Sequence, residues 1–170
     1  MGNAIVSRTG GAAALAMAWC AVFACAHLFW ALGGSAGLAS SAGTELAAAR
    51  PTAFVLAGLW GVAGLLLAGV AVIYLAATAD RGRRLRRLTG WVLGVIGAGL
   101  VLRGLAVEVL LMADAGVRSA AGPLETRWSL ILWNPWFIIG GIVLGGAAGR
   151  VARRAGAGYG QMRPGGSADG

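Results

Sequence analysis

Four polar side chains interrupt otherwise apolar stretches of this sequence, and their types could do chemistry. They are His27, Arg103, Glu108 and Asn134. A polar or ionisable group inside an apolar span is costly, so each needs a partner or a cavity. A carboxylate beside an imidazole is also the usual pairing of a proton relay. Together with Trp30, which follows His27, these residues are the candidates for a ligand- or proton-binding site.

The elements that must position these residues are four apolar segments. The chain has 170 residues, of which 58% are hydrophobic and 12% charged, with a mean hydropathy of +0.77. A soluble domain would have roughly a quarter of its residues charged. The apolar segments cover about residues 12–32, 52–78, 88–112 and 128–149, and about 20 apolar residues cross a bilayer as a helix. The sequence therefore predicts an all-α polytopic membrane protein, an antiparallel bundle of four transmembrane helices.

The charges predict the orientation of this bundle. Arginines outnumber acidic residues in the amino-terminal segment 1–11, in the run Asp80 to Arg87 and in the tail 151–170, whereas the two remaining loops are short and near neutral. By the positive-inside rule, both termini are cytoplasmic in a bacterial cell membrane, and the tail is disordered. The arginine run could also bind anionic lipid or a regulatory partner. No basic patch is interleaved with surface aromatics, so the bilayer is an expected partner and nucleic acid is not.

The first apolar segment has a rival interpretation as a cleaved signal peptide. Ala24, Cys25 and Ala26 resemble a small-x-small cleavage site. The apolar run continues past this site to Leu32, however, and is longer than the hydrophobic region of a signal peptide, which has about 7–15 residues. We therefore interpret it as a first span.

The fourth segment combines an aromatic cluster with a helix-disrupting proline. Trp128, Trp133 and Trp136 lie near its beginning, as tryptophans do at a membrane–water interface. Pro135 cannot donate a hydrogen bond to the carbonyl of Ile131, so a kink is expected there.

Small residues recur at helical spacing on three of the segments. Such spacing lets two helices approach closely. The expected packing glycines are Gly61 and Gly64 on the second segment, Gly94, Gly97 and Gly104 on the third, and Gly141 and Gly145 on the fourth. The same stripes could serve a homo-oligomer or a partner in a membrane complex.

Depth and helical phase predict that three of the polar residues converge. At 1.5 Å per residue, His27, Glu108 and Asn134 lie roughly 6–9 Å from the outer ends of their segments. Each also shares a helix face with small residues. They could satisfy one another and fix the helix register, or they could bind a ligand or a proton. Arg103 is roughly 140° away from Glu108 around the helix, so it would face another span, another subunit or a lipid headgroup.

Counting residues argues against several enzyme classes. Cys20 and Cys25 form no C-x-x-C pair. A single histidine cannot supply two axial haem ligands, and Cys20 with His27 lacks a third zinc ligand. No P-loop, G-x-S-x-G or H-E-x-x-H motif is present. We expect no catalytic residue, no metal and no cofactor.

Two stretches carry a family resemblance. They are His27 to Gly34 (HLFWALGG) and Trp133 to Gly141 (WNPWFIIGG). They resemble small four-span bacterial membrane proteins catalogued as a domain of unknown function, family thirty-nine ninety-five. The resemblance implies an integral membrane protein without an assigned activity, and it supplies no catalytic residues.

Two classes of function remain open. The first is a non-enzymatic structural or accessory membrane component, for which the glycine stripes are the main support. The second is a small proton-coupled transporter or small-molecule-binding protein that uses an outer-leaflet His/Glu/Asn cluster. An outward-opening cavity beside these residues would favour the second class.

Overall fold

The computed structural model of the chain describes residues 10–78 and 82–157, with side chains as far as Arg153. This part of the chain is helical and contains no strand. Most of the segment 1–11 and the tail from residue 158 onward lie outside the described residues.

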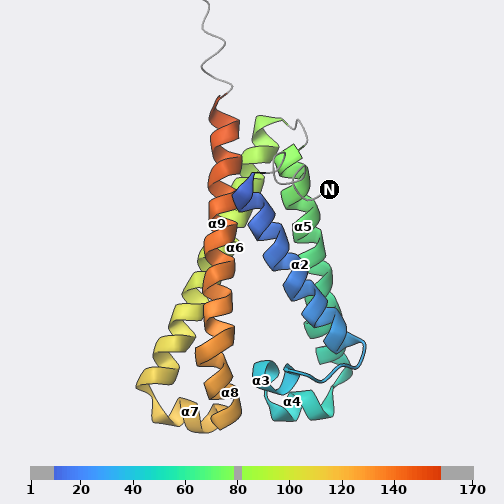
Figure 1. Cartoon of the computed structure of the whole chain (residues 1–170), viewed down its shortest axis with the longest axis vertical. Coiled ribbons are helices and arrows are strands. Elements are labelled where there is room, and N and C mark those ends of the chain that lie inside the picture. Colours follow the sequence, from blue (N-terminus) through green and yellow to red (C-terminus); the bar gives the residue numbers. More distant parts are fainter. Residues whose placement is uncertain (1–9, 79–81, 158–170) are drawn as a thin grey trace, which may run out of the picture.

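Four long apolar helices run between the two ends of the molecule (Figure 1). The first is α2 (Gly11–Ala31), and the second joins the π-helix η1 (Phe54–Gly61) to α5 (Val62–Thr78). The third is α6 (Arg83–Ala113). The fourth joins α8 (Pro123–Trp128), the π-helix η2 (Ser129–Trp133) and α9 (Asn134–Ala157). Each is long and apolar enough to cross a membrane, so the protein is a multi-pass membrane protein, and the predicted fold class is confirmed.

Two of these bounds differ from expectation, and the backbone before Pro135 is irregular. The arginine run is helical from Arg83, because it continues the third span as its first turns. Residues 151–157, expected in a disordered tail, extend α9. The chain before Pro135 forms a π-helical turn. A proline lacks the N–H for the normal bond and crowds the carbonyl four residues earlier, and a wider turn relieves that crowding.

The segments between spans at the opposite end from the described termini are also helical (Figure 1). They form α3 (Leu38–Ala42), α4 (Thr44–Ala49) and α7 (Ala115–Ala121), besides α8. The side chain of Leu38 is only 1% exposed and packs with Trp30 and Leu59. Asp114 caps α7 by accepting hydrogen bonds from the backbone N–H groups of Gly116 and Val117. The two segments expected to be short, near-neutral loops therefore contain short helices; we call this end of the molecule the loop end.

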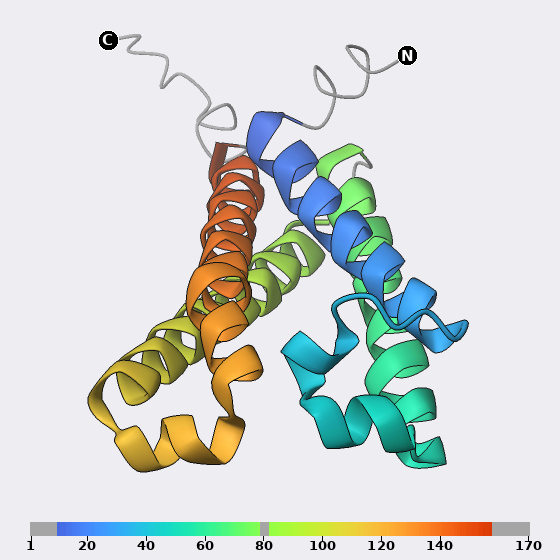
Figure 2. The same ribbon diagram turned by 60° about the horizontal axis from the view of Figure 1, so that its bottom comes forward.

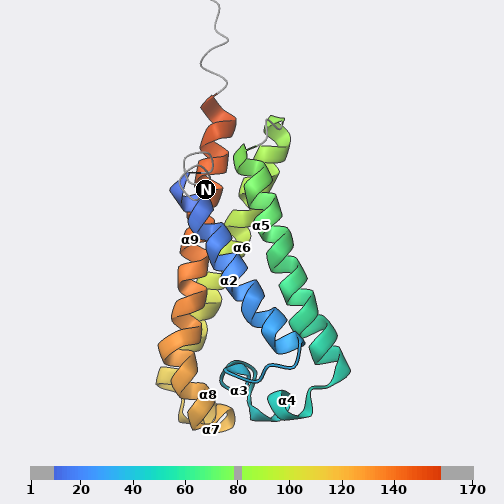
Figure 3. The same cartoon turned by 45° about the vertical axis from the view of Figure 1, so that its right-hand side comes forward.

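The long helices do not form a closed square. α6 packs along α9, α9 contacts α2, and α2 packs along α5, whereas α5 and α6 barely touch. The order is therefore α5, α2, α9, α6. In Figures 1 and 2 the α2–α5 pair and the α6–α9 pair diverge toward the loop end. Figure 3 shows α2 crossing between α5 and α9.

Glycines bring α6 and α9 into backbone contact. A Cβ on Gly97 would lie 2.8 Å from the carbonyl oxygen of Gly141, and one on Gly104 would lie 3.0 Å from that of Asn134. Only a residue without a side chain fits such an approach. This contact makes α6 and α9 the tightest pair in the described structure.

Gly61 and Gly64 do not bring their span close to another described helix. A Cβ on Gly64 would meet nothing within 4 Å, and one on Gly61 would meet only the carbonyl of Leu56 in its own helix. The second span instead buries Leu59, Ala63 and Ile73. Ile73 can point inward because it shares a buried cluster with small residues of α2, Ala13, Ala16 and Cys20, whereas Leu59 packs with Trp30 and Leu38. On α9, Gly145 contributes its backbone, 3.1 Å from a Cβ built on Gly97, although its own Cβ position is open.

The tryptophans of the fourth span do not all lie at an interface. The ring of Trp136 stacks on Trp19 of α2 with centroids 5.7 Å apart, and Trp19 donates a hydrogen bond to the carbonyl of Trp136. Trp128 is the exposed member, at 40%. The aromatic cluster thus joins α9 to α2 where the two helix pairs meet.

Candidate functional site

A cavity of about 430 Å³ lies where the two helix pairs diverge. Its walls come from α2, η1, α6 and η2 with α9, and α3 and α8 border it at the loop end. The polar side chains that line it are His27, Ser41, Arg103, Glu125, Ser129 and the indole of Trp133. Three of the candidate residues, His27, Trp30 and Arg103, therefore line one cavity.

His27 reaches the cavity from the inward face of α2. Its ring is 9% exposed and packs edge-on against Phe23 and Trp30, with centroids 4.5 and 5.2 Å away. Nδ1 lies 2.9 Å from the carbonyl oxygen of Phe23. A carbonyl only accepts, so Nδ1 carries the proton, and in the neutral ring Nε2 keeps its lone pair. No described residue hydrogen-bonds Nε2, which leaves it able to serve a ligand in the cavity.

Arg103 enters the cavity from α6. Its guanidinium carbon lies 3.9 Å from the centroid of the Phe137 ring, a cation–π contact. Among the described residues no carboxylate pairs with this guanidinium. Arg103 precedes the end of α6 at Ala113 by about 15 Å of helix, which places it near the middle of a hydrocarbon core about 30 Å thick. A cation at that depth is expensive unless something in the cavity compensates it.

Two tryptophans hold α3 and the turn that precedes it over the cavity. The indole N–H of Trp30 donates to the carbonyl oxygen of Ala36 at 2.7 Å, and that of Trp133 donates to Oγ of Ser40 at 3.3 Å. Their rings pack edge-on with centroids 5.9 Å apart. The cavity therefore has a largely aromatic wall whose position is set by directed hydrogen bonds.

Both π-helical segments border the cavity. η1 contributes Phe54, Gly58 and Leu59, and η2 contributes Ser129 and Trp133. Single π-helical turns inside α-helices are frequent at functional sites, because the wider turn redirects side chains. Here the two turns lie on opposite helix pairs and both face the same space.

The predicted three-residue cluster divides in two. Nδ2 of Asn134 donates a hydrogen bond to Oε2 of Glu108 at 2.8 Å, joining α9 to α6. Asn134 is 1% exposed, and neither it nor Glu108 lines the cavity. In the described structure His27 bonds to neither of them, and its Nδ1 bonds the carbonyl oxygen of Phe23 in its own helix. Glu108 and Asn134 thus lie at the α6–α9 interface, and His27 lies in the cavity with Arg103.

Several lining residues were missed by reasoning from the sequence. Glu125 was counted only as a charge that cancels in a neutral loop, and Ser41, Ser129 and Phe54 had no evident partner. The proximity of Pro51 and Pro135 to the two π-helical turns is the one sequence feature that indicates irregular backbone there.

A metal site needs a group of ligating side chains, and the cysteines of the described residues are free. No three His, Cys, Asp or Glu side chains within them are grouped as a metal site requires. Cys20 is buried and Cys25 is exposed, and both are free thiols.

The fold and the cavity together define a small four-span membrane protein with a ligand-sized space between its helix pairs. The chain belongs to the family described as protein of unknown function (DUF3995), whose sequence model matches residues 20–144. This match covers all four spans in whole or in part and confirms the family resemblance carried by the first and fourth spans. No curated protein and no solved structure matches the chain.

Proposed function

We propose that this protein is a non-enzymatic membrane protein that binds a small amphipathic monoanion, such as an aromatic or aliphatic carboxylate, in the loop-end cavity. The bacterial cell membrane is its proposed location. Both termini are proposed to be cytoplasmic, so that the cavity opens to the outside. The proposal includes proton-coupled transport of the bound monoanion across the membrane.

Arg103 is the observation that carries the proposal. It is a cation near mid-membrane, it lines a cavity, and within the described residues it has an aromatic ring but no acid for a partner. Intramembrane charges of this kind mark substrate and ion pathways. A carboxylate could form a bidentate hydrogen-bonded pair with the guanidinium and neutralise it.

The other lining groups restrict the ligand further. The rings of Phe23, Trp30 and Phe54 would contact an apolar body. Nε2 of His27, as an acceptor, suits a hydroxyl or N–H group on the ligand. Glu125 of α8 disfavours a second negative group toward the loop end. A ligand with one acidic group and an apolar body fits these constraints.

A structural or accessory role is the second candidate. The close α6–α9 contact and the Glu108–Asn134 hydrogen bond are what such a component needs. That role requires no cavity and gives no reason for Arg103 to line one. Only the ligand-binding candidate therefore predicts that Arg103→Gln abolishes stabilisation by a carboxylate.

Thermal stabilisation by added carboxylates tests the proposal. The detergent-solubilised protein is heated with and without benzoate, indole-3-acetate or octanoate, alongside the variants Arg103→Gln and Arg127→Gln. Arg127 is an exposed arginine of α8 that does not line the cavity, so its variant is the matched control. A ligand at about 100 times its Kd adds about 2.7 kcal/mol of stability. We expect that stabilisation in the wild type and in Arg127→Gln and its loss in Arg103→Gln; equal responses from all three proteins would contradict the proposal.

A further inference from the structure

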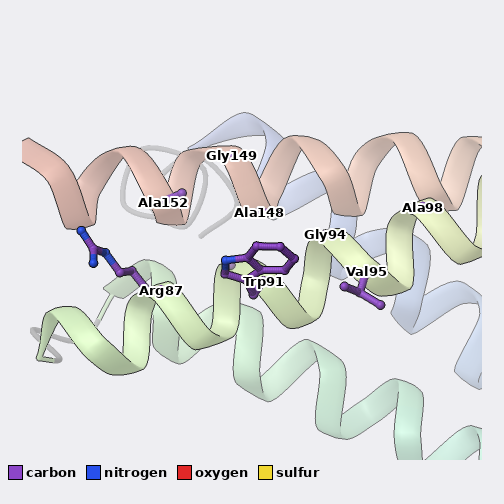
Figure 4. A pocket seen from close by; sticks show the side chains of 9 residues that line it. Arg87, Trp91, Gly94, Val95, Ala98, Ala148, Gly149 and Ala152 are labelled. Atoms are coloured by element: carbon purple, nitrogen blue, oxygen red, sulfur yellow. The ribbon is translucent and has the colours of Figure 1, made fainter.

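A second hollow lies between α6 and α9, at the end of the molecule opposite to the loop end. It is a groove of about 680 Å³. Its floor consists of small residues from both helices, Gly90, Gly94, Ala98, Ala148, Gly149 and Ala152 (Figure 4). None of the polar residues of the loop-end cavity takes part in it.

One end of this groove is cationic. Arg87 lines it and extends from α6 toward α9 (Figure 4). The guanidinium of Arg153 lies beside the groove residue Gly149, with Nη1 3.5 Å from the position a Cβ would take there. In the described chain no acidic residue lines the groove. Two guanidinium groups from different helices are therefore associated with an otherwise apolar channel: Arg87 lines it from α6, and Arg153 of α9 lies beside its residue Gly149.

The position and the length of the groove along α6 match one leaflet of a bilayer. Arg87 is the last residue before the apolar part of α6, and Trp91, one turn further, is 75% exposed beside the groove. Arginine and tryptophan at this position are typical of the headgroup level. From Arg87 to Ala98 the helix rises about 16 Å, close to half of a hydrocarbon core of about 30 Å.

We propose that the groove binds one anionic phospholipid, with its phosphate between Arg87 and Arg153 and an acyl chain over Gly94 and Ala98. The charge of the arginines complements the phosphate, and the missing side chains of the floor make room for the chain. Juxtamembrane arginines attract anionic lipids in general. The groove adds a specific site to that general attraction.

Native mass spectrometry of the full-length protein tests the assignment. The protein is released from micelles containing equal amounts of phosphatidylglycerol and phosphatidylcholine with the same acyl chains, and retained lipids are counted. We expect one preferentially retained phosphatidylglycerol. Arg87→Gln and Arg153→Gln should each reduce that preference about fivefold. Arg84→Gln, an exposed arginine of the same run outside this groove, should leave it unchanged.

A substitution that fills the groove tests the acyl chain separately. A Cβ at Gly94 would lie 3.9 Å from Cβ of Ala148, an ordinary contact, so the rest of a leucine in Gly94→Leu would occupy the groove. It should abolish retention of the lipid, whereas Gly99→Leu should not, because Gly99 has open space around it on the same helix.

Two outcomes would overturn the proposal. An equal loss with Arg84→Gln and Arg87→Gln would mean that only diffuse positive charge attracts the lipid. A dimer that Gly94→Leu dissociates, with lipid retention unchanged, would mean that the groove holds a second copy of the chain.

Discussion

Asn134 donates a hydrogen bond to the carboxylate of Glu108 at 2.8 Å, and this bond links the fourth span to the third inside the apolar part of the protein. Asn134 is almost completely buried. Water is scarce at such a position, so the amide has few alternative partners. The bond is therefore a structural element of the α6–α9 pair.

Substitutions of Glu108 should separate hydrogen bonding from charge. Glu108→Gln keeps an acceptor for Asn134, so the melting temperature in detergent should change little. Glu108→Leu leaves the buried amide without its acceptor and should cost about 1–3 kcal/mol. The double variant Glu108→Leu with Asn134→Leu should recover much of that loss, because both polar partners are removed together. Equal melting temperatures for all four proteins would show that the bond does not contribute to stability.

The backbone contact between α6 and α9 predicts a contrast between two glycines. A Cβ on Gly141 would collide with the backbone carbonyl of Gly97, so Gly141→Ala should force the helices apart and lower the melting temperature markedly. Gly99→Ala is the control, because nothing lies within 4 Å of its Cβ position. The control should be neutral or stabilising, since alanine favours a helix by about 1 kcal/mol over glycine. Similar melting temperatures for the two variants would contradict the close contact.

The indole of Trp30 should control the order of the segment that borders the cavity. Trp30→Phe keeps an aromatic ring but removes the N–H that donates to Ala36. Amide hydrogen exchange in residues 33–42 should therefore accelerate. Trp60→Phe is the matched control, because Trp60 is 43% exposed and does not line the cavity. Unchanged exchange in Trp30→Phe would mean that the Trp30 hydrogen bond does not order this segment, and that the Trp133–Ser40 hydrogen bond and the apolar contacts hold it instead.

Helical periodicity was sufficient to predict part of this structure. Four apolar stretches of span length predicted four long helices, and these are present. Depth and phase placed Glu108 and Asn134 on facing stripes, and the two residues do form a hydrogen bond. Both inferences depend on properties of a single helix or of two helices that pack along their length.

The cavity depends on which helices are neighbours, and periodicity does not determine that. His27 was expected beside Glu108 because both face inward at similar depth. The order α5, α2, α9, α6 instead directs the inward face of α2 at the space between two diverging pairs. Periodicity also did not show which helix would supply the small residues at the α2–α5 contact. α2 supplies them, and Gly61 and Gly64 take no part in that contact.

The histidine signal in nuclear magnetic resonance tests the central claim most directly, because His27 is the only histidine of the sequence. Protein carrying ¹⁵N-histidine and no polyhistidine tag gives imidazole signals from this one residue. We predict a neutral ring protonated at Nδ1, and a change of the Nε2 shift when indole-3-acetate is added, because its indole N–H can donate to Nε2; Arg103→Gln should abolish this change. A ring protonated at Nε2, or an Nε2 shift that saturating indole-3-acetate leaves unchanged, would contradict an anion-binding cavity built on His27 and Arg103.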